Sequence, residues 1–342
     1  MKRAPFLGGA AAGAASLAAL PARAQDLTTL RVGILGIATD APVGIADQKG
    51  YFREHGIKIE TVKLTSSEVM MPLLAGTGLD IGTGAPGASL YNAVIRGIDL
   101  RAVADASTDP PGYGWSKLLI RTDLVKSGKF KTIKDLRGMT IAGAARASSS
   151  AAQVARLLAM AGLAYSDVKR TVLPYSQHVV ALRNGALEAA LTIEPFATLA
   201  VDSGVAVAVM GNDTFYPNQE VSCVLCAAAL IKDRRDVIVR YLCGFLKGVR
   251  FYHSGLRDGH FAGAAGDDVV RQIALLTTAP EALVRRTTPT VIDPNGRLNL
   301  GSMRADLAFY KSQGFIEGDI TVDRVVDTSL SAEATKIIGT VR

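Results

Sequence analysis

One stretch of the chain, residues 79–104, limits the possible folds more than any other. Its sequence, LDIGTGAPGASLYNAVIRGIDLRAVA, reads as a short apolar strand, a glycine-rich turn, an amphipathic helix and a second apolar strand. Such a βαβ unit has a right-handed crossover and builds a parallel sheet. The turn from Gly82 to Gly87 also matches the G-x-G-x-x-G pattern of dinucleotide-binding enzymes, and Asp105 stands 18 residues after Gly87. The rest of the chain must therefore decide between an enzyme and a binding protein.

The first 25 residues have the pattern of an export signal. Lys2 and Arg3 give a basic start, residues 6–20 are apolar and uncharged, and the sequence ARA that ends at Ala24 is a cleavage pattern. We expect export by the Sec or the twin-arginine route, cleavage near Ala24 and a periplasmic mature protein. No later run approaches the ~20 apolar residues that a membrane span needs.

Composition and charge restrict the class of partner. The chain has 342 residues, and 49% of them are hydrophobic, which is enough for two domains that each have a core. The formal net charge of +7 falls to about +4 when Lys2, Arg3 and Arg23 leave with the signal. No block of five like charges occurs, so the sequence argues against nucleic acid as a partner.

The cysteines and histidines indicate structural roles. Cys223 and Cys226 lie in an apolar run, residues 221–230, that reads as a buried strand, and positions three apart on a strand face opposite sides. Zinc binding and redox chemistry are therefore not expected there, and we expect Cys243 to be structural as well. The four histidines are scattered without the spacing of metal ligands. The sequence therefore predicts no metal site, and these histidines support no Ser/His/Asp arrangement.

Strands and helices alternate in two blocks of the remaining chain. The first block covers about residues 30–104 and the second about residues 117–210. Irregular connectors follow them at 105–115 and 211–218. This alternation is typical of an α/β fold with open sheets. We therefore expect two lobes of similar design, between which the chain crosses out and back.

The predicted division places the signal peptide at 1–25, lobe I at 26–110 and 216–342, and lobe II at 111–215. In open α/β sheets, ligands bind beyond the carboxyl ends of the strands. Two such lobes joined by two crossings bring both sets of strand ends to one cleft, which can close by hinge motion.

The order of the motifs resembles that of one family of exported binding proteins. The matching pieces are LRVGILG with Pro42, Gly50-Tyr51-Phe52, Gly56-Ile57, Leu74-Ala75-Gly76, Leu79-Asp80-Ile81-Gly82, Arg96-Gly97, Asp135-Leu136-Arg137-Gly138-Met139, Ala161-Gly162-Leu163, Asp167-Val168, Ala181-Leu182-Arg183-Asn184-Gly185 and Glu194-Pro195-Phe196. In these pieces, spread over about residues 28–330, the chain is similar to the substrate-binding proteins of ABC importers for nitrate, sulfonates and taurine. It also resembles the related binders of thiamine-precursor pyrimidines.

This resemblance implies the two-lobed type II periplasmic-binding-protein fold. In that fold each lobe is an open, mostly parallel sheet flanked by helices, and two crossover strands join the lobes. The resemblance also implies a small-molecule ligand in the cleft and neither catalysis nor a cofactor. The expected partners of the monomeric protein are a membrane permease and its ATPase.

Other functions fit the sequence less well. A nicotinamide-dependent enzyme would carry the glycine turn after its first strand, whereas here the turn follows the third strand, and an exported protein meets no nicotinamide pool. The pyrimidine synthases that share the fold carry a cysteine-rich run that this chain lacks. A binder of the thiamine-precursor pyrimidine is the main alternative, although Ile37-Ala38-Thr39-Asp40 departs from the aromatic and asparagine-rich first turn of such binders. A sensor that signals to a partner also stays open.

Four segments and the two connectors are expected to line the cleft, because each is a strand-to-helix turn or a crossover. The candidate residues are Thr39 and Asp40; Thr83, Ala85, Pro86 and Gly87; Arg146, Ser148 and Ser149; Glu194 and Phe196; and Tyr113, Trp115 and Tyr216 on the connectors. The glycine turn allows close approach to the backbone, and the serines beside the arginine open a helix, so both segments suit an anion. Ordinary helix capping and turn packing would explain part of each pattern.

The remaining candidates shape the predicted ligand. Glu194 either accepts a hydrogen bond from the ligand or holds Arg146 in place, and we expect the arginine partner. The connector aromatics either sandwich a flat or apolar ligand or pack at the hinge. Since donors outnumber acceptors, the sequence predicts a small organic anion, a sulfonate or a carboxylate with an apolar or aromatic body.

Overall fold

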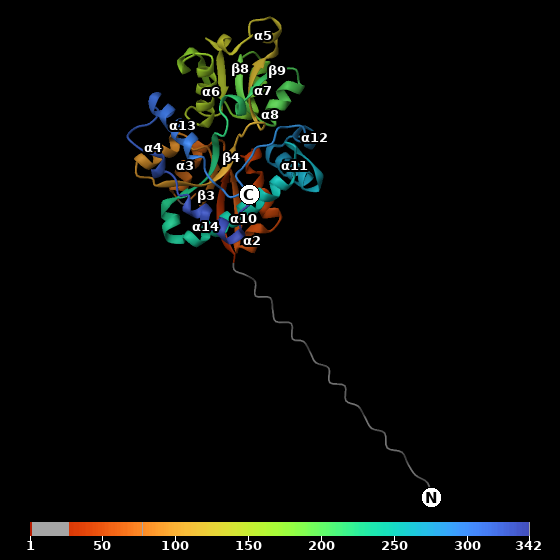
Figure 1. The fold of residues 1–342 in the computed structure, drawn as a ribbon, viewed down its shortest axis with the longest axis vertical. Coiled ribbons are helices and arrows are strands. Elements are labelled where there is room, and N and C mark those ends of the chain that lie inside the picture. Colours follow the sequence, from red (N-terminus) through yellow and green to blue (C-terminus); the bar gives the residue numbers. More distant parts are fainter. Residues whose placement is uncertain (2–26, 77, 342) are drawn as a thin grey trace.

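Strands from two separate parts of the chain build the sheet of lobe I, the lower lobe in Figure 1. The structure is a computed structural model that describes Met1, residues 27–76 and residues 78–341. The predicted signal peptide lies outside the described residues apart from Met1. In order across the sheet, the strands are β2 (Ile57–Lys63), β1 (Thr28–Ile34), β3 (Ile81–Gly84), β10 (Glu220–Ala227) and β4 (Leu100–Thr108). β1 pairs in parallel with β2 and β3, whereas β10 runs antiparallel to β3 and β4.

Helices pack on both faces of the lobe I sheet. They are α1 (Ala41–Gln48), α2 (Tyr51–Glu54), α3 (Ser67–Ala75), α4 (Ala88–Ile95), α10 (Ala228–Ser254), α11 (Gly263–Thr277), α12 (Glu281–Val284), α13 (Leu300–Ser312) and α14 (Ser329–Ile338). On β10, Cys223 and Leu225 join an apolar cluster with α3, α4 and α13, while Val224 and Cys226 join another with α1, α10 and α14. The three cysteines are buried and form no disulfide. Burial on both faces explains why this strand is a continuous apolar run.

Lobe II repeats the design with a sheet made from one continuous segment. In order across this sheet, the strands are β7 (Lys169–Val172), β6 (Thr140–Gly143), β8 (Ala189–Ile193), β5 (Ser116–Arg121) and β9 (Ala206–Gly211). Its helices are α5 (Thr122–Lys126), α6 (Ser149–Met160), α7 (Tyr175–Arg183) and α8 (Phe196–Asp202). β6 is parallel to β7 and β8, and β5 is antiparallel to β8 and β9. In each lobe the antiparallel strand is the first strand after the chain crosses over.

The two crossings are more regular than the sequence predicted. β4 continues to Thr108, because the backbone N–H of Thr108 donates to the Val291 carbonyl at 2.7 Å and so extends the pairing. The return crossing begins with a short helix, α9 (Asn212–Phe215). The crossings are also bonded to each other, since the Asn218 N–H donates to the Asp109 carbonyl at 2.8 Å.

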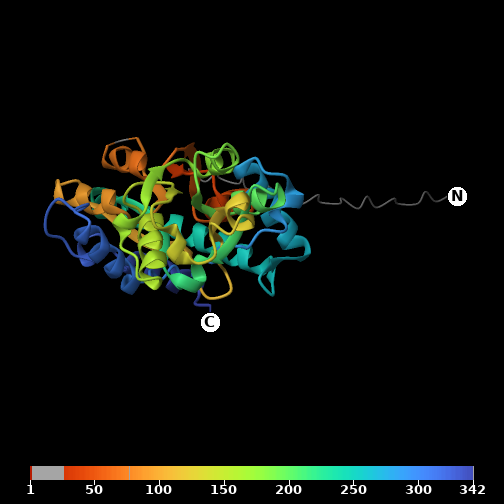
Figure 2. The ribbon, with the colours of Figure 1, turned by 90° about the horizontal axis from the view of Figure 1, so that it is seen from above.

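The lobes meet on two opposite sides of the molecule (Figures 1 and 2). On one side, α6 of lobe II packs on α13 of lobe I, and one apolar cluster contains buried side chains of both lobes, including Val154 and Met303. On the other side, beside α8 and α12, Arg286 Nη2 lies 2.5 Å from Asp202 Oδ2. The two contacts therefore differ in chemistry, apolar on the first side and polar on the second.

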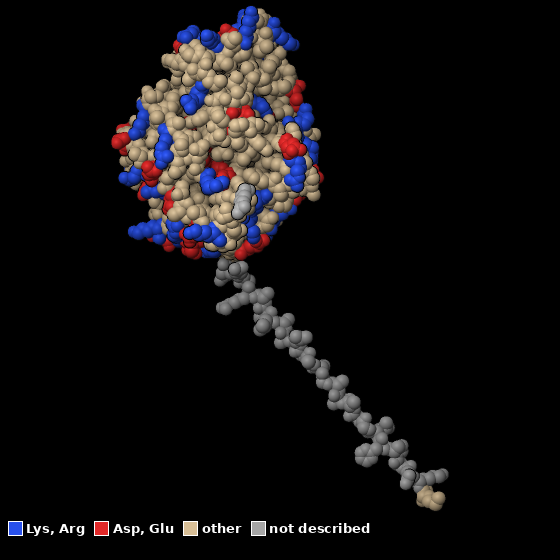
Figure 3. Space-filling model, in the orientation of Figure 1, with Lys and Arg blue, Asp and Glu red and all other residues tan. Residues whose placement is uncertain are grey.

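The surface carries its charges unevenly. On the face shown in Figure 3, basic and acidic side chains alternate over lobe I, a few basic ones gather at the tip of lobe II, and the middle is largely uncharged. No helix in the described part of the chain is both long and apolar enough to cross a membrane.

Candidate functional site

A cavity of ≈ 510 Å³ lies between the lobes, within the ~300–1,000 Å³ range of small-molecule pockets. Most of its lining residues come from the turns 35–39, 64–68 and 85–89 of lobe I and from 144–149, 174–176 and Phe196 of lobe II, and Lys63, Trp115, Val221, Ser222, Thr277 and Thr278 complete it. These segments follow β1, β2 and β3 in lobe I and β6, β7 and β8 in lobe II. The cavity thus lies at the carboxyl ends of the parallel strands of both sheets, where open α/β sheets bind ligands.

Asp40 positions the first of these turns from behind the lining. Its buried carboxylate accepts the backbone N–H groups of Leu35 and Ile37 at 3.0 and 3.1 Å, and it also accepts the Thr83 hydroxyl. Burial raises the pKa of the Asp40 carboxyl to about 6, although these hydrogen bonds act in the opposite direction. Asp40 and Thr83 were expected at the ligand, but they hold the turn in shape, and the adjacent Thr39 lines the cavity.

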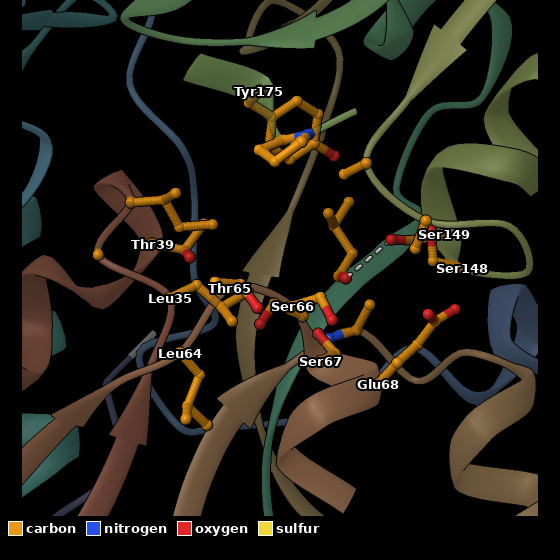
Figure 4. A pocket seen from close by; sticks show the side chains of 18 of the residues that line it. Leu35, Thr39, Leu64, Thr65, Ser66, Ser67, Glu68, Ser148, Ser149 and Tyr175 are labelled. Atoms are coloured by element: carbon orange, nitrogen blue, oxygen red, sulfur yellow. Dashed lines mark hydrogen bonds between the residues drawn. The ribbon is translucent and has the colours of Figure 1, made fainter. Parts of the chain in front are cut away.

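Four serines gather on one side of the cavity (Figure 4). Ser66 caps α3 in lobe I and Ser67 begins it, whereas Ser148 and Ser149 occupy the same positions at α6 in lobe II. Ser67 Oγ accepts the backbone N–H of Ala85 at 2.9 Å, which leaves the Ser67 hydroxyl proton free to donate. The first N–H groups of each helix also lack intrahelical partners, and the helix dipoles favour negative charge. This side of the cavity therefore suits an anion or another strong acceptor.

Aromatic side chains of lobe II form another part of the lining. Trp115, Tyr175 and Phe196 all line the cavity. The Trp115 side chain is buried, and its Nε1 has no hydrogen-bond partner among the described residues. Burial raises the pKa of the Tyr175 hydroxyl to about 12, so this group is protonated at neutral pH. Together with Leu35 and Leu64 of lobe I, these rings give the ligand apolar surface in the cavity.

Two charged side chains line the cavity among the described residues, and both belong to lobe I. Lys63, the last residue of β2, donates from Nζ to the Leu276 carbonyl at 3.1 Å. Glu68 lies in the first turn of α3 and makes no hydrogen bond or ion pair with another described residue. Figure 4 shows Glu68 on the same side of the cavity as Ser148 and Ser149.

The structure corrects the predicted pairing of Arg146 with Glu194. Arg146 is exposed, and its guanidinium lies over the Phe315 ring of lobe I, 5.6 Å from the ring centroid, where it makes a cation–π contact. The Glu194 carboxylate instead pairs with Lys117 Nζ at 2.5 Å and accepts the Thr198 N–H at 3.0 Å. The reason is topological, because β5 and β8 are neighbours in the sheet and bring the lysine beside the glutamate. Neither predicted residue lines the cavity.

Three other predicted residues also lie outside the lining. Tyr216 is buried and donates its hydroxyl to Asp306, which turns the side chain into lobe I. Pro86 is buried within the turn between two lining residues, and Tyr113 is part of a turn in which its N–H donates to the Pro110 carbonyl at 3.0 Å. The predicted residues that do line the cavity are Thr39, Ala85, Gly87, Trp115, Ser148, Ser149 and Phe196.

Sequence reasoning missed part of the lining. The residues that it did not single out include Lys63, Ser66, Ser67, Glu68 and Tyr175. A signal was present in the run LTSSE (64–68), in which two serines follow the end of a strand and open a helix. This is the same pattern that identified the serines at 148 and 149.

The described residues at the cavity include neither a metal-binding group nor a cysteine. No group of three or more histidine, cysteine, aspartate or glutamate side chains in the described residues could hold a metal ion. The three cysteines are fully buried in the core of lobe I and do not line the cavity. Burial also raises the thiol pKa of Cys226 to about 12, which keeps this thiol protonated.

Two lobes of this topology with a cavity between their strand ends define a two-lobed binding-protein fold. A family model described as the NMT1-like family matches residues 23–254. The chain therefore belongs to the NMT1-like family. No protein of curated function matches the sequence.

Solved structures share the fold at low sequence identity. The alkanesulfonate-binding protein of Xanthomonas axonopodis pv. citri, bound to MOPS, is 18% identical with a TM-score of 0.71, over 88% of this chain and 98% of that one. The aliphatic sulphonate binding protein of Escherichia coli is 19% identical with a TM-score of 0.69, over 88% and 92%. The nitrate-binding protein of Synechocystis PCC 6803 is 13% identical with a TM-score of 0.74, over 92% and 89%. These similarities confirm the predicted fold class and the predicted resemblance.

Proposed function

We propose that the protein is the periplasmic solute-binding component of an ABC importer and captures a small organic anion between its lobes. The anion is a sulfonate or a carboxylate with an apolar body. Hinge closure encloses it, and the closed form delivers it to a membrane permease that works with an ATPase. The chain itself carries out no reaction.

The arrangement of the cavity lining carries this proposal. The four serines and two helix starts from both lobes gather on one side, and aromatic and aliphatic side chains line other parts of the cavity together with hydroxyls such as that of Thr39. An acidic head group with an apolar body matches that division. A ligand held between Ser67 of lobe I and Ser148 of lobe II binds the closed state more tightly than the open state, which is the condition for ligand-driven closure.

The anion site that we propose keeps the predicted Ser148 and Ser149, adds Ser66 and Ser67, and does not include Arg146. With the arginine outside the cavity, the donors are neutral hydroxyls and backbone N–H groups, together with Lys63 at the edge. Neutral donors at helix starts bind anions without an ion pair. The family relationship supports the same class of ligand, since similar structures bind alkanesulfonates and nitrate.

Native mass spectrometry of protein purified from its own host tests the proposal. We expect a bound organic acid that is lost on mild denaturation, and calorimetric titration with that acid should show one site per chain. Protein that carries no ligand and does not bind any member of a sulfonate and carboxylate panel would contradict the proposal.

A thiamine-precursor pyrimidine is the second candidate ligand. The observation that favours it is the aromatic lining from Trp115, Tyr175 and Phe196, which suits a flat ring. Titration with 4-amino-5-hydroxymethyl-2-methylpyrimidine separates the two candidates, because that compound has no anionic group for the serines.

A further inference from the structure

Glu68 has an unusual place in a cavity that suits anions. It is the one acidic side chain among the described residues that line the cavity, and it lies on the side where the serines gather. Its carboxylate has no cationic partner there, because Lys63 donates to Leu276 and no described ion pair includes Glu68. A bound anion beside the serines would therefore meet a negative charge that forms no ion pair, although the lining also holds Lys63.

A hydrogen-bond donor on the ligand removes this conflict. A carboxylate accepts and cannot donate, so an ammonium or hydroxyl group of the ligand would satisfy Glu68 while the acidic head group faces Ser148 and Ser149. The helix dipole of α3 also stabilises the negative charge of Glu68, which lies in its first turn, but this stabilisation does not depend on the cavity.

We propose that Glu68 selects organic acids that carry a donor, an amine or a hydroxyl, next to the acidic group, and that it disfavours acids without one. This inference rests on the proposed function and narrows its substrate class. Because Glu68 is exposed to water, the expected preference is on the order of fivefold.

Two pairs of similarly sized probes test the role of Glu68. They are 2-aminoethanesulfonate against 1-propanesulfonate, and 3-aminopropanoate against butanoate, titrated calorimetrically at neutral pH. Wild-type protein should prefer the amino compound of at least one pair. Glu68→Gln should weaken binding of that compound, strengthen binding of its plain analogue and so abolish the preference. Glu60→Gln, which removes the same charge from an exposed site on β2, should leave the preference unchanged.

The outcomes separate the two proposals. An equal preference in wild-type and Glu68→Gln protein would overturn the role of Glu68 and leave the proposed function intact. The role of Glu68 would also be overturned if wild-type protein bound 1-propanesulfonate and butanoate more tightly than their amino analogues. Failure of all four probes to bind would count against the substrate class and the proposed function together.

The interlobe contacts carry a second, independent inference. On the α6–α13 side, the apolar cluster includes Val154, Leu157 and Leu158 of lobe II with Met303 and Leu307 of lobe I. All five side chains are buried. The Tyr165 ring of lobe II also contacts the Phe309 ring of lobe I edge-on, with 5.1 Å between centroids. Separating the lobes here would expose this surface to water.

The α8–α12 side has no comparable shared cluster among the described residues. The apolar cluster beneath α8 consists of lobe II residues alone, and the cluster beneath α12 consists of lobe I residues alone. Polar contacts join the lobes there: the Asp202–Arg286 ion pair and a 2.9 Å hydrogen bond from Lys117 Nζ to Thr288 Oγ1. Water replaces the exposed ion pair at little cost, and the part-buried contact of Lys117 adds a single hydrogen bond.

We infer that the cleft opens on the α8–α12 side while the α6–α13 contact stays closed and serves as part of the hinge. The ligand then enters beside Phe196, which begins α8, and the Asp202–Arg286 pair acts as a latch that salt weakens. This inference requires no particular ligand.

Spin-label distances on both sides test the inference, and the native cysteines are too buried to be labelled. Val201→Cys with Ala282→Cys spans the α8–α12 side, and Ala159→Cys with Ser312→Cys spans the α6–α13 side; all four positions are exposed. Raising NaCl to ~1 M, where the screening length is about 3 Å, should lengthen and broaden the first distance and leave the second unchanged. Arg286→Ala should do the same at low salt. No change in the first distance, or an equal change in both, would overturn the inference.

Discussion

Gly87 of lobe I lies so close to Ala147 of lobe II that a Cβ at position 87 would be 2.7 Å from the Ala147 carbonyl oxygen. The next residue, Ala88, donates its N–H to that same oxygen at 2.8 Å. The backbone of Gly87 itself, with φ of −82° and ψ of −178°, is an extended conformation that any residue adopts. The glycine is therefore needed for the approach of the lobes, not for the turn.

Gly87→Ala should hold the lobes apart without unfolding either one. The added methyl group meets backbone atoms that cannot move aside within lobe II, and overpacking of this kind costs about 1–3 kcal/mol. Ligand affinity should fall by roughly 5- to 150-fold, with a Tm within a few degrees of wild type. Calorimetric titration and small-angle scattering measure the two effects. Gly318→Ala, whose Cβ would be 3.4 Å from its nearest neighbour, is the control. Wild-type affinity in the Gly87 variant would contradict the role of this contact.

Lys117→Met should destabilise lobe II, because it leaves the Glu194 carboxylate buried without its cation. The Glu194 side chain is 2% exposed and that of Lys117 is 22% exposed, so the loss is smaller than for a fully buried pair, about 2–3 kcal/mol. Chemical denaturation checks this value. The double variant Lys117→Met with Glu194→Gln should recover part of the loss, since no uncompensated charge remains. If Lys117→Met is as stable as wild type, the prediction is wrong, and water must solvate the Glu194 carboxylate in place of the lysine.

Asp105 and Glu220 should make the folded state less stable as pH rises from 5 to 8, a contribution that opposes that of His178, whose pKa burial lowers to about 4. Asp105 on β4 and Glu220 on β10 are interacting buried carboxyls, and burial raises the pKa of Asp105 to about 7 and that of Glu220 well above its usual range. Because the folded-state pKa of Asp105 lies above its unfolded value, the stabilisation is fully present below pH about 4 and is lost as pH rises through about 7.

Thermal unfolding from pH 5 to pH 8 measures this dependence. In Glu220→Gln, the amide donates to Asp105 without a proton that can be lost, so the decline in Tm with pH should become shallower by roughly 2 °C or more. Asp306, another buried carboxyl whose pKa burial raises to about 7, keeps part of the decline in both proteins. A decline in Tm with pH that is as steep or steeper in Glu220→Gln would contradict the proposed coupling between Asp105 and Glu220.

Much of the fold follows from local sequence patterns. The alternation of apolar strands and amphipathic helices predicts both sheets, and the serines at 148 and 149 were identified because a hydroxyl run at a helix start has a local signature. The glycine turn after β3 lines the cavity with Ala85 and Gly87, although the reason for Gly87 is a contact with the other lobe. Patterns of this kind act within a few residues, which is why one sequence reveals them.

Contacts between distant parts of the chain could not be predicted in this way. Arg146 lies over Phe315, which is contributed by a segment 169 residues later, and no spacing rule connects the two. Glu194 pairs with Lys117 only because β5 lies beside β8, and strand order is not encoded in either strand. Tyr216 turns away from the cavity toward Asp306 for a similar reason. The predicted turns therefore reach the cavity, whereas the long side chains predicted with them make contacts outside its lining.

Titration of the fluorescence of Trp115 tests the central claim most directly, because this residue is the single tryptophan of the chain and lines the cavity. At least one sulfonate or carboxylate should cause a saturable, one-site change in emission. Ser148→Ala with Ser149→Ala should weaken that binding by roughly fivefold or more, since the Ser148 hydroxyl is lost as a donor and the Ser149 hydroxyl no longer fixes the start of α6 by donating to the Val221 carbonyl. Ser203→Ala, at the exposed end of α8, should bind as wild type does. No saturable change with any such acid, or equal affinity in the double-serine variant, would contradict the account.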